Sequence, residues 1–160
     1  MNTEGEIEFL RTYKDFIYHF NMLDRNVGYC LCYCLQREGN ESPEKWLYQS
    51  FDSKRKRILS LANENELSEE FNEWDSQVEK IRHFRNIISH GAWDWNWWLP
   101  DPIHYHAPEI ENGKGALSLT AFKQKFNELK NCAYEFSDIR TSLEISIAQK
   151  TQPVASGQRR

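Results

Sequence analysis

The sequence feature that most constrains the fold is a row of apolar residues at helical spacing near the N-terminus. Apolar side chains recur there every three or four positions, over about eight turns. The row consists of Phe9, Tyr13, Phe16, Phe20, Leu23, Val27, Leu31 and Cys34. Such a stripe is typical of one long amphipathic helix, which must bury its apolar face against other elements. We therefore expect a first helix over residues 7–36 and a fold built mainly from packed helices.

Three later segments carry the same spacing. Ser42-Pro43-Glu44 places a proline where a first helical residue is expected, so a second helical segment is predicted to begin near Pro43. A third helix is predicted from about Ser68 to His90, and a fourth begins near Thr120. Short connections between four helices favour an up-and-down bundle.

The stretch between the third and fourth helices differs in composition. It contains four closely spaced tryptophans, then a proline-rich turn, and later Asn112-Gly113-Lys114-Gly115, which is typical of a turn before a strand at 116–119. We expect a β-hairpin or three short strands here, as an insertion over about residues 92–119. The predicted fold class is mainly all-α, a four-helix bundle with this insertion. Residues 1–150 are expected to form a single domain and residues 151–160 a disordered tail.

Composition narrows the possible functions. The chain has 160 residues and a formal net charge of -4, which argues against a protein that coats nucleic acid without selectivity. Neither a basic, apolar leader nor a membrane-length apolar run is present in the sequence, so we expect a cytoplasmic protein without a membrane partner. Three of the four cysteines fall within residues 30–34, which favours reduced thiols over a disulfide framework.

Arg85 is the anomaly of the third helix. It occupies a position on the apolar stripe where a hydrophobic residue is expected, between apolar neighbours that include Phe71, Trp74, Val78, Ile81 and Ile88. A buried or half-buried guanidinium needs partners for its donors. The position therefore predicts a carboxylate, backbone carbonyls or an anionic ligand facing Arg85.

Two polar residues follow on a second face of the same helix. Asn86 and His90 are four positions apart and so share this face, with Arg82 one turn earlier. Gly91 is expected to end the helix as a left-handed residue. His90 therefore belongs to the last turn, where a protonated imidazole is favoured by the helix dipole.

The run Arg85-Asn86-Ile87-Ile88-Ser89-His90-Gly91 resembles the Arg-x4-His motif of the HEPN superfamily. The resemblance implies a HEPN-like helical bundle, a homodimer with both motif copies facing one cleft, and a metal-independent endoribonuclease acting as a toxin or in phage defence. It also implies an antitoxin or defence-system partner and assigns the catalytic roles to Arg85, Asn86 and His90. Toxins of this type that are modified by a nucleotidyltransferase carry a tyrosine where this chain has Ala92, so the resemblance does not extend to that regulation.

The chemistry of these side chains suits RNA without a metal or another cofactor. RNA supplies its own nucleophile, the 2′-hydroxyl, so only proton transfer and charge stabilisation are needed. His90 is the candidate proton carrier. Arg85 is the candidate contact to the phosphorane oxygens, and Asn86 would orient His90 or contact the phosphate. DNA, which lacks the 2′-hydroxyl, is not an expected substrate.

One basic run offers further candidate RNA contacts. Together with Arg82, these candidates are Lys54, Arg55, Lys56 and Arg57. The same run also suits a solvated helix face with no ligand.

A different class of function is compatible with the same sequence. The chain could be a catalytically inactive HEPN-like module that binds a partner protein or a nucleotide. His104 and His106 could bind a metal with His90, although they are more typical of rim residues. Cys30 and Cys34 share a helix face and suit small core positions. The tryptophan cluster could stack on unpaired bases or form a hydrophobic lid or dimer contact.

Overall fold

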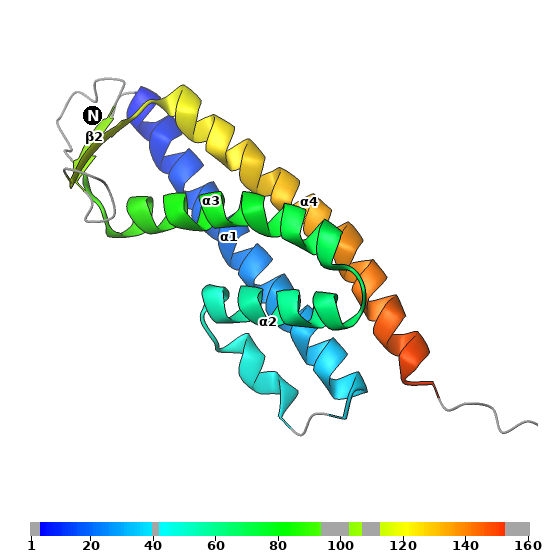
Figure 1. The fold of residues 1–160 in the computed structure, drawn as a ribbon. Helices are drawn as coiled ribbons and strands as arrows, with labels where there is room; N and C mark the ends of the chain where they lie inside the picture. Colours follow the sequence, from blue (N-terminus) through cyan, green and yellow to red (C-terminus); the bar gives the residue numbers. More distant parts are fainter. Residues whose placement is uncertain (1–3, 40–41, 94–102, 107–112, 153–160) are drawn as a thin grey trace, which may run out of the picture. The chain divides into compact units, whose positions relative to one another are not determined.

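The computed structural model describes residues 4–39, 42–93, 103–106 and 113–152. Its elements are α1 (Glu4–Arg37), a short 3-10 helix η1 (Pro43–Leu47), α2 (Phe51–Glu64), α3 (Ser68–His90), β1 (Ala92–Trp93), β2 (Ile103–His106), β3 (Lys114–Leu117) and α4 (Leu119–Lys150). Figure 1 shows the four α-helices and the small sheet that follows α3. The predicted mainly-α class, with a β insertion between the third and fourth helices, is confirmed.

The chain forms two compact units. The first consists of Met1–Leu23 and Glu73–Glu135, and the second consists of Asp24–Asn72 and Phe136–Arg160. Each unit combines separate parts of the sequence, because α1, α3 and α4 each contribute residues to both. The expectation of a single domain stays a prediction. The predicted tail lies outside the described residues from position 153 onward.

Aromatic side chains form the core of the first unit. The ring of Phe16 lies 5.4 Å from that of Phe84 and 5.8 Å from that of Phe122, centroid to centroid. Phe9 joins the cluster at 5.1 Å from Phe122. These contacts connect α1, α3 and α4, and tilted or edge-on aromatic pairs add about 0.5–1.5 kcal/mol each beyond the burial of their area. The apolar stripe read from the sequence is thus the face that α1 buries.

The insertion is a three-stranded antiparallel sheet with the order β1-β2-β3. Ala92 pairs with His106 across the first ladder, and His106 pairs with Lys114 across the second. Of the two forms expected from the sequence, three short strands are observed. The last strand starts two residues before the predicted position, because the turn residues Lys114 and Gly115 are already in the ladder. Of the tryptophans, Trp95, Trp97 and Trp98 lie outside the described residues.

A helical segment begins at Pro43 as predicted, but it is separate from the α-helix that follows. Pro43 begins only the short 3-10 helix, and the α-helix starts at Phe51. The physical reason is a local cap: the Ser50 hydroxyl accepts a hydrogen bond from the Ser53 N–H at 3.2 Å. Ser50 therefore ends the preceding turn and nucleates α2.

The cysteines form no disulfides, in agreement with the prediction of reduced thiols. All four are free, and Cys30 and Cys34 are fully buried on α1 with their sulfur atoms 4.0 Å apart. Their predicted role as small core residues is confirmed. Across the part of the chain that is described, no helix combines the length and apolar character needed to cross a membrane.

Candidate functional site

The C-terminal half of α3 carries the Arg-x4-His motif. Arg85 is half-buried, and its Nη1 donates a hydrogen bond to Oδ1 of Asn86 at 3.3 Å. Its guanidinium carbon lies 5.5 Å from the centre of the buried Phe20 ring on α1. A guanidinium over an aromatic face is attracted by the ring quadrupole. The Phe20 ring therefore supports the guanidinium of Arg85. The sequence indicated only that Phe20 belongs to an apolar stripe, and did not predict this contact.

The donors of Arg85 are incompletely used. Its Nε is buried and has no hydrogen-bond partner among the described residues. No carboxylate in the described part of the chain forms an ion pair with it. The hydrogen-bond partner observed among the described residues is a side-chain amide oxygen, which was not among the partners expected from the sequence. Leaving a cationic donor group unpaired in a partly buried place costs free energy that an anionic ligand would recover.

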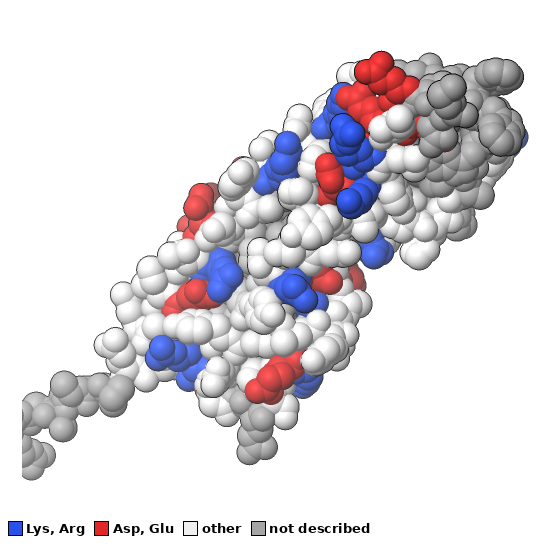
Figure 2. All heavy atoms as spheres, turned by 180° about the vertical axis from the view of Figure 1, so that it is seen from behind, with Lys and Arg blue, Asp and Glu red and all other residues white. Residues whose placement is uncertain are grey.

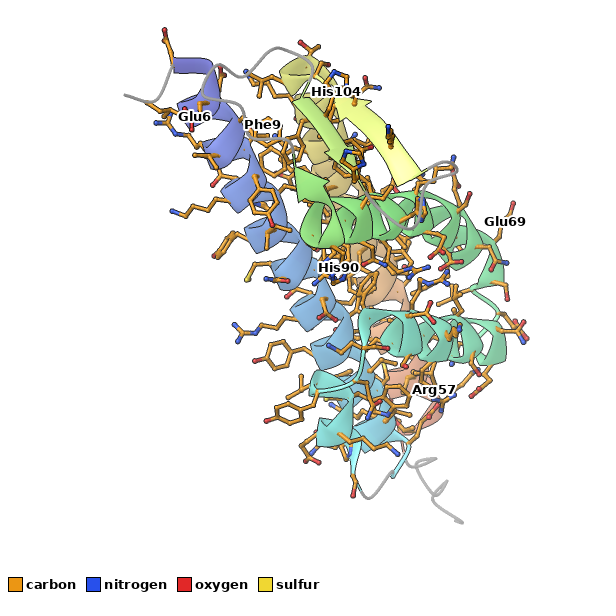
Figure 3. The ribbon with its side chains drawn as sticks, turned by 90° about the vertical axis from the view of Figure 1, so that its left-hand side faces the viewer. Glu6, Phe9, Arg57, Glu69, His90 and His104 are labelled. Carbon is orange, nitrogen blue, oxygen red and sulfur yellow. The ribbon has the colours of Figure 1, made fainter. Side chains whose placement is uncertain are left out.

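His90 is the last residue of α3, and its side chain is exposed. Figure 3 labels it at the end of α3. Asn86 lies one turn earlier on the same face, while Arg85 lies about 140° around the helix from His90 at 3.6 residues per turn. The helix thus brings Asn86 and His90 to one face, and the bond between Asn86 and Arg85 connects the guanidinium to that face.

Gly91 follows the motif, but not in the predicted conformation. Among the described glycines only Gly39 and Gly113 have positive φ, so the expected left-handed helix end at Gly91 is wrong. The Gly91 N–H instead continues the helical pattern with a 2.7 Å bond to the Ile87 carbonyl. A Cβ at Gly91 would lie 2.6 Å from that oxygen and 3.4 Å from the His106 carbonyl. Glycine is needed here for close approach of the backbone.

Arg82, the predicted RNA contact on α3, is paired within its own helix. Its Nε and Nη2 donate to the two carboxylate oxygens of Glu79 at 2.7 and 2.6 Å. This bidentate pair matches the charge of Arg82 locally, and a phosphate would compete with Glu79 for the same donors. The role of Arg82 in RNA binding stays a prediction.

The basic run on α2 is also matched by acids. Arg55 and Lys56 both pair with Asp52, at 3.1 and 2.7 Å, and Arg57 pairs with Glu64 at 3.3 Å. The Lys56 ammonium, followed by the Arg55 guanidinium, lowers the pKa of the Asp52 carboxyl. On the face shown in Figure 2, basic and acidic residues are interspersed. These ion pairs are typical of a solvated helix face, in which each charge has an opposite charge nearby.

Lys54 requires a correction. Its side chain is only 2% exposed, and its ammonium lies 2.7 Å from Oδ1 of Asp24 on α1. The side chain is thus turned inward and bound to a carboxylate, and we do not retain it as a phosphate contact. Asp24 could not be identified from the sequence because the two residues are 30 positions apart.

The sheet presents two histidines. His104 and His106 are exposed and alternate with the half-buried Tyr105 on β2. Within the described residues, no group of three or more His, Cys, Asp or Glu side chains is arranged to hold a metal ion. Lys114, which the sequence analysis did not select, lies directly opposite His106. Only the register between strands reveals this neighbourhood.

Comparison with protein families, curated proteins and solved structures finds no match to this chain.

Proposed function

We propose that the protein is a metal-independent endoribonuclease whose site consists of Arg85, Asn86 and His90. The HEPN-like arrangement of these residues at the end of a helix supports the proposal, as does the mainly-α fold around them. On this proposal the protein acts in the cytoplasm as a toxin or phage-defence effector, together with an antitoxin or defence-system partner.

The observation that carries the proposal is the state of Arg85. Its guanidinium rests on Phe20, keeps a buried Nε without a partner among the described residues, and forms no ion pair with a carboxylate there. An arginine that only filled the core would be expected to have its charge matched. A scissile phosphate, whose negative charge grows in the transition state, would match the charge of the guanidinium.

The reaction uses the exposed His90 as the proton carrier. The 2′-oxygen forms a bond to phosphorus while the bond from phosphorus to the 5′-oxygen breaks. A proton leaves the 2′-hydroxyl and a proton is supplied to the departing 5′-oxygen, and an imidazole is able to perform either transfer. The products are a 2′,3′-cyclic phosphate and a 5′-hydroxyl end.

A second copy of the chain would complete the site. The backbone positions of Arg85 and His90 lie about 140° apart around one helix, and only the bond to Asn86 connects the Arg85 guanidinium to the face of His90. A two-fold dimer with both motifs at one cleft would combine Arg85 of one protomer with His90 of the other.

One observation favours a second candidate function, that of an inactive helical module that binds a partner protein. Four large apolar side chains are exposed on α1 within the first unit, namely Ile7, Leu10, Tyr18 and Met22. Exposed apolar residues gathered on one element are typical of interaction surfaces.

Two histidine substitutions on α3 distinguish the ribonuclease from the binding module. His90→Ala should reduce cleavage of single-stranded RNA by about 10²- to 10⁴-fold, the usual contribution of a general acid or base. His83→Ala is the matched control, because His83 is an exposed histidine of the same helix outside the motif. A complete lack of activity in all three, with each protein folded, would favour the binding module. Equal activity in all three would show that His90 is not the proton carrier.

A further inference from the structure

The three-stranded sheet has one face turned to solvent. Exposure alternates along both longer strands: His104 and His106 are exposed on β2, and Lys114 and Ala116 are exposed on β3. The pairing places His106 opposite Lys114 and His104 opposite Ala116. These four residues define the outer face of the sheet, whereas the adjacent Leu117 is buried.

The outer face carries the ammonium of Lys114 beside two imidazoles. Directly paired residues in an antiparallel sheet have Cβ atoms about 4.5–5.5 Å apart, so the His106 ring and the Lys114 stem are neighbours. The described strand residues include no aspartate or glutamate. The charge of Lys114 is therefore not matched within the described strands, in contrast to the paired basic residues of α2.

The opposite face holds this arrangement in register. Tyr105 pairs with Gly115, and its ring lies over that glycine so closely that a Cβ there would be 2.6 Å from Cζ. Any larger residue at 115 would displace the ring. Tyr105 and Gly115 thus fix the pairing that brings His106 beside Lys114.

The sheet adjoins the motif along the chain. Strand β1 begins two residues after His90, Ala92 pairs with His106, and a Cβ at Gly91 would lie 3.4 Å from the His106 carbonyl. Figure 3 labels His90 at the end of α3 and His104 on the sheet beyond it, as separate positions. The outer face is therefore next to the proposed reaction site without being part of it.

We propose that the outer face binds the backbone of single-stranded RNA outside the scissile bond, an inference that rests on the proposed ribonuclease function. Lys114 offers an ammonium to phosphate oxygens, the His104 imidazole offers an N–H donor, and the rings of His104 and His106 are flat surfaces on which unpaired bases stack. The small Ala116 lies opposite His104. Binding at this face would improve affinity without changing the chemical step.

The test uses a 12-nucleotide, fluorescein-labelled 2′-O-methyl oligonucleotide, which binds but cannot be cleaved through its 2′-oxygen. Anisotropy at several salt concentrations gives Kd and its salt dependence. Lys114→Gln should weaken binding about 3- to 10-fold at low salt and reduce the slope of log K against log salt by about 0.7, the value for one phosphate contact on a single strand. His104→Ala with His106→Ala should weaken binding further. Lys45→Gln, an exposed lysine of η1, is the control and should change neither quantity.

An unchanged Kd and salt slope in the variant that combines all three substitutions, with its melting temperature equal to that of wild type, would overturn the inference. Substitutions that weaken binding of an acidic peptide but not of the oligonucleotide would also overturn it, because the face would then serve a protein partner. Binding does not require cleavage. If the wild type binds the oligonucleotide but cleaves no RNA, and the substitutions abolish binding, the inference about this face is supported and only the ribonuclease activity is refuted. In a cleaving wild type, the same substitutions should raise KM and leave kcat unchanged.

Discussion

At the scale of single residues, Arg85 combines a contact to the core with a proposed chemical role. Its guanidinium lies over the Phe20 ring, whereas its Nε remains buried and unpaired among the described residues. Arg85→Met keeps an unbranched side chain against the ring and removes the unpaired donor. We expect RNA cleavage to be lost, while the free energy of unfolding stays equal or rises by up to about 1–2 kcal/mol. Thermal unfolding and a cleavage assay measure the two effects.

Arg85→Lys is the matched control for charge. A lysine keeps the positive charge but lacks the planar fork of donors that binds a phosphate in two places, so we expect most of the activity to be lost here as well. A loss of stability above about 2 kcal/mol in Arg85→Met would show that the guanidinium is needed for folding. The interpretation of Arg85 as a phosphate ligand would then lose its main support.

At the scale of elements, the buried ion pair between Lys54 and Asp24 connects α2 to α1 within the second unit. Asp24→Ala would leave the Lys54 ammonium buried without a partner, and we expect a cost of roughly 2–4 kcal/mol in chemical denaturation. Lys56→Ala is the control, because it breaks an ion pair of α2 in which the side chains of Lys56 and Asp52 are exposed to 69% and 34%. Its cost should be about 1 kcal/mol or less. Equal costs would mean that the burial of Lys54 has no energetic consequence.

A second element-scale prediction concerns Cys132 on α4, whose carbonyl accepts a 3.1 Å hydrogen bond from the Trp74 indole on α3. Burial raises the pKa of the Cys132 thiol to about 11 from 9.0. Between pH 9 and 11 the unfolded thiol has lost its proton while the folded thiol still keeps it, so the unfolded state gains an advantage as the pH rises. The free energy of unfolding is therefore unaffected by this thiol below pH 9 and decreases between pH 9 and 11. Melting temperatures of Cys132→Ala should therefore fall less steeply than those of wild type across this range. Parallel curves would contradict the shift.

The helices and strands also show how much of the fold could be predicted from the sequence. The stripe from Phe9 to Cys34 predicted a helix over residues 7–36, and α1 spans Glu4–Arg37, because periodic burial is a local pattern. The start of α2 was not predicted, because Pro43 and Ser50 are both residue types that commonly precede or begin a helix. In the structure Pro43 begins the 3-10 helix and Ser50 caps the α-helix. Lys54 was misjudged because its carboxylate comes from another helix. The motif residues could be selected from the sequence, but the ring beneath Arg85 and the lysine opposite His106 depend on tertiary contacts.

At the scale of the whole molecule, the proposed site needs two copies of the chain. Light scattering should therefore give the mass of a dimer at micromolar concentration. Mixing inactive Arg85→Met and His90→Ala proteins should restore up to about a quarter of wild-type activity, since half of randomly paired dimers are mixed and each keeps one complete pair of Arg85 and His90. A monomer, or a mixture as inactive as its components, would contradict the shared site.

The most direct test of the proposed ribonuclease uses a DNA oligonucleotide that contains one ribonucleotide, incubated with the wild-type protein in excess EDTA. Because the only nucleophile in this substrate is a single 2′-hydroxyl, cleavage should occur solely on its 3′ side. Mass spectrometry should find a 2′,3′-cyclic phosphate on one product and a 5′-hydroxyl on the other, and His90→Ala should leave the substrate intact over the same time. Cleavage at deoxynucleotides, cleavage that stops on chelation, or no cleavage of any ribonucleotide-containing substrate would contradict a metal-independent ribonuclease at Arg85, Asn86 and His90.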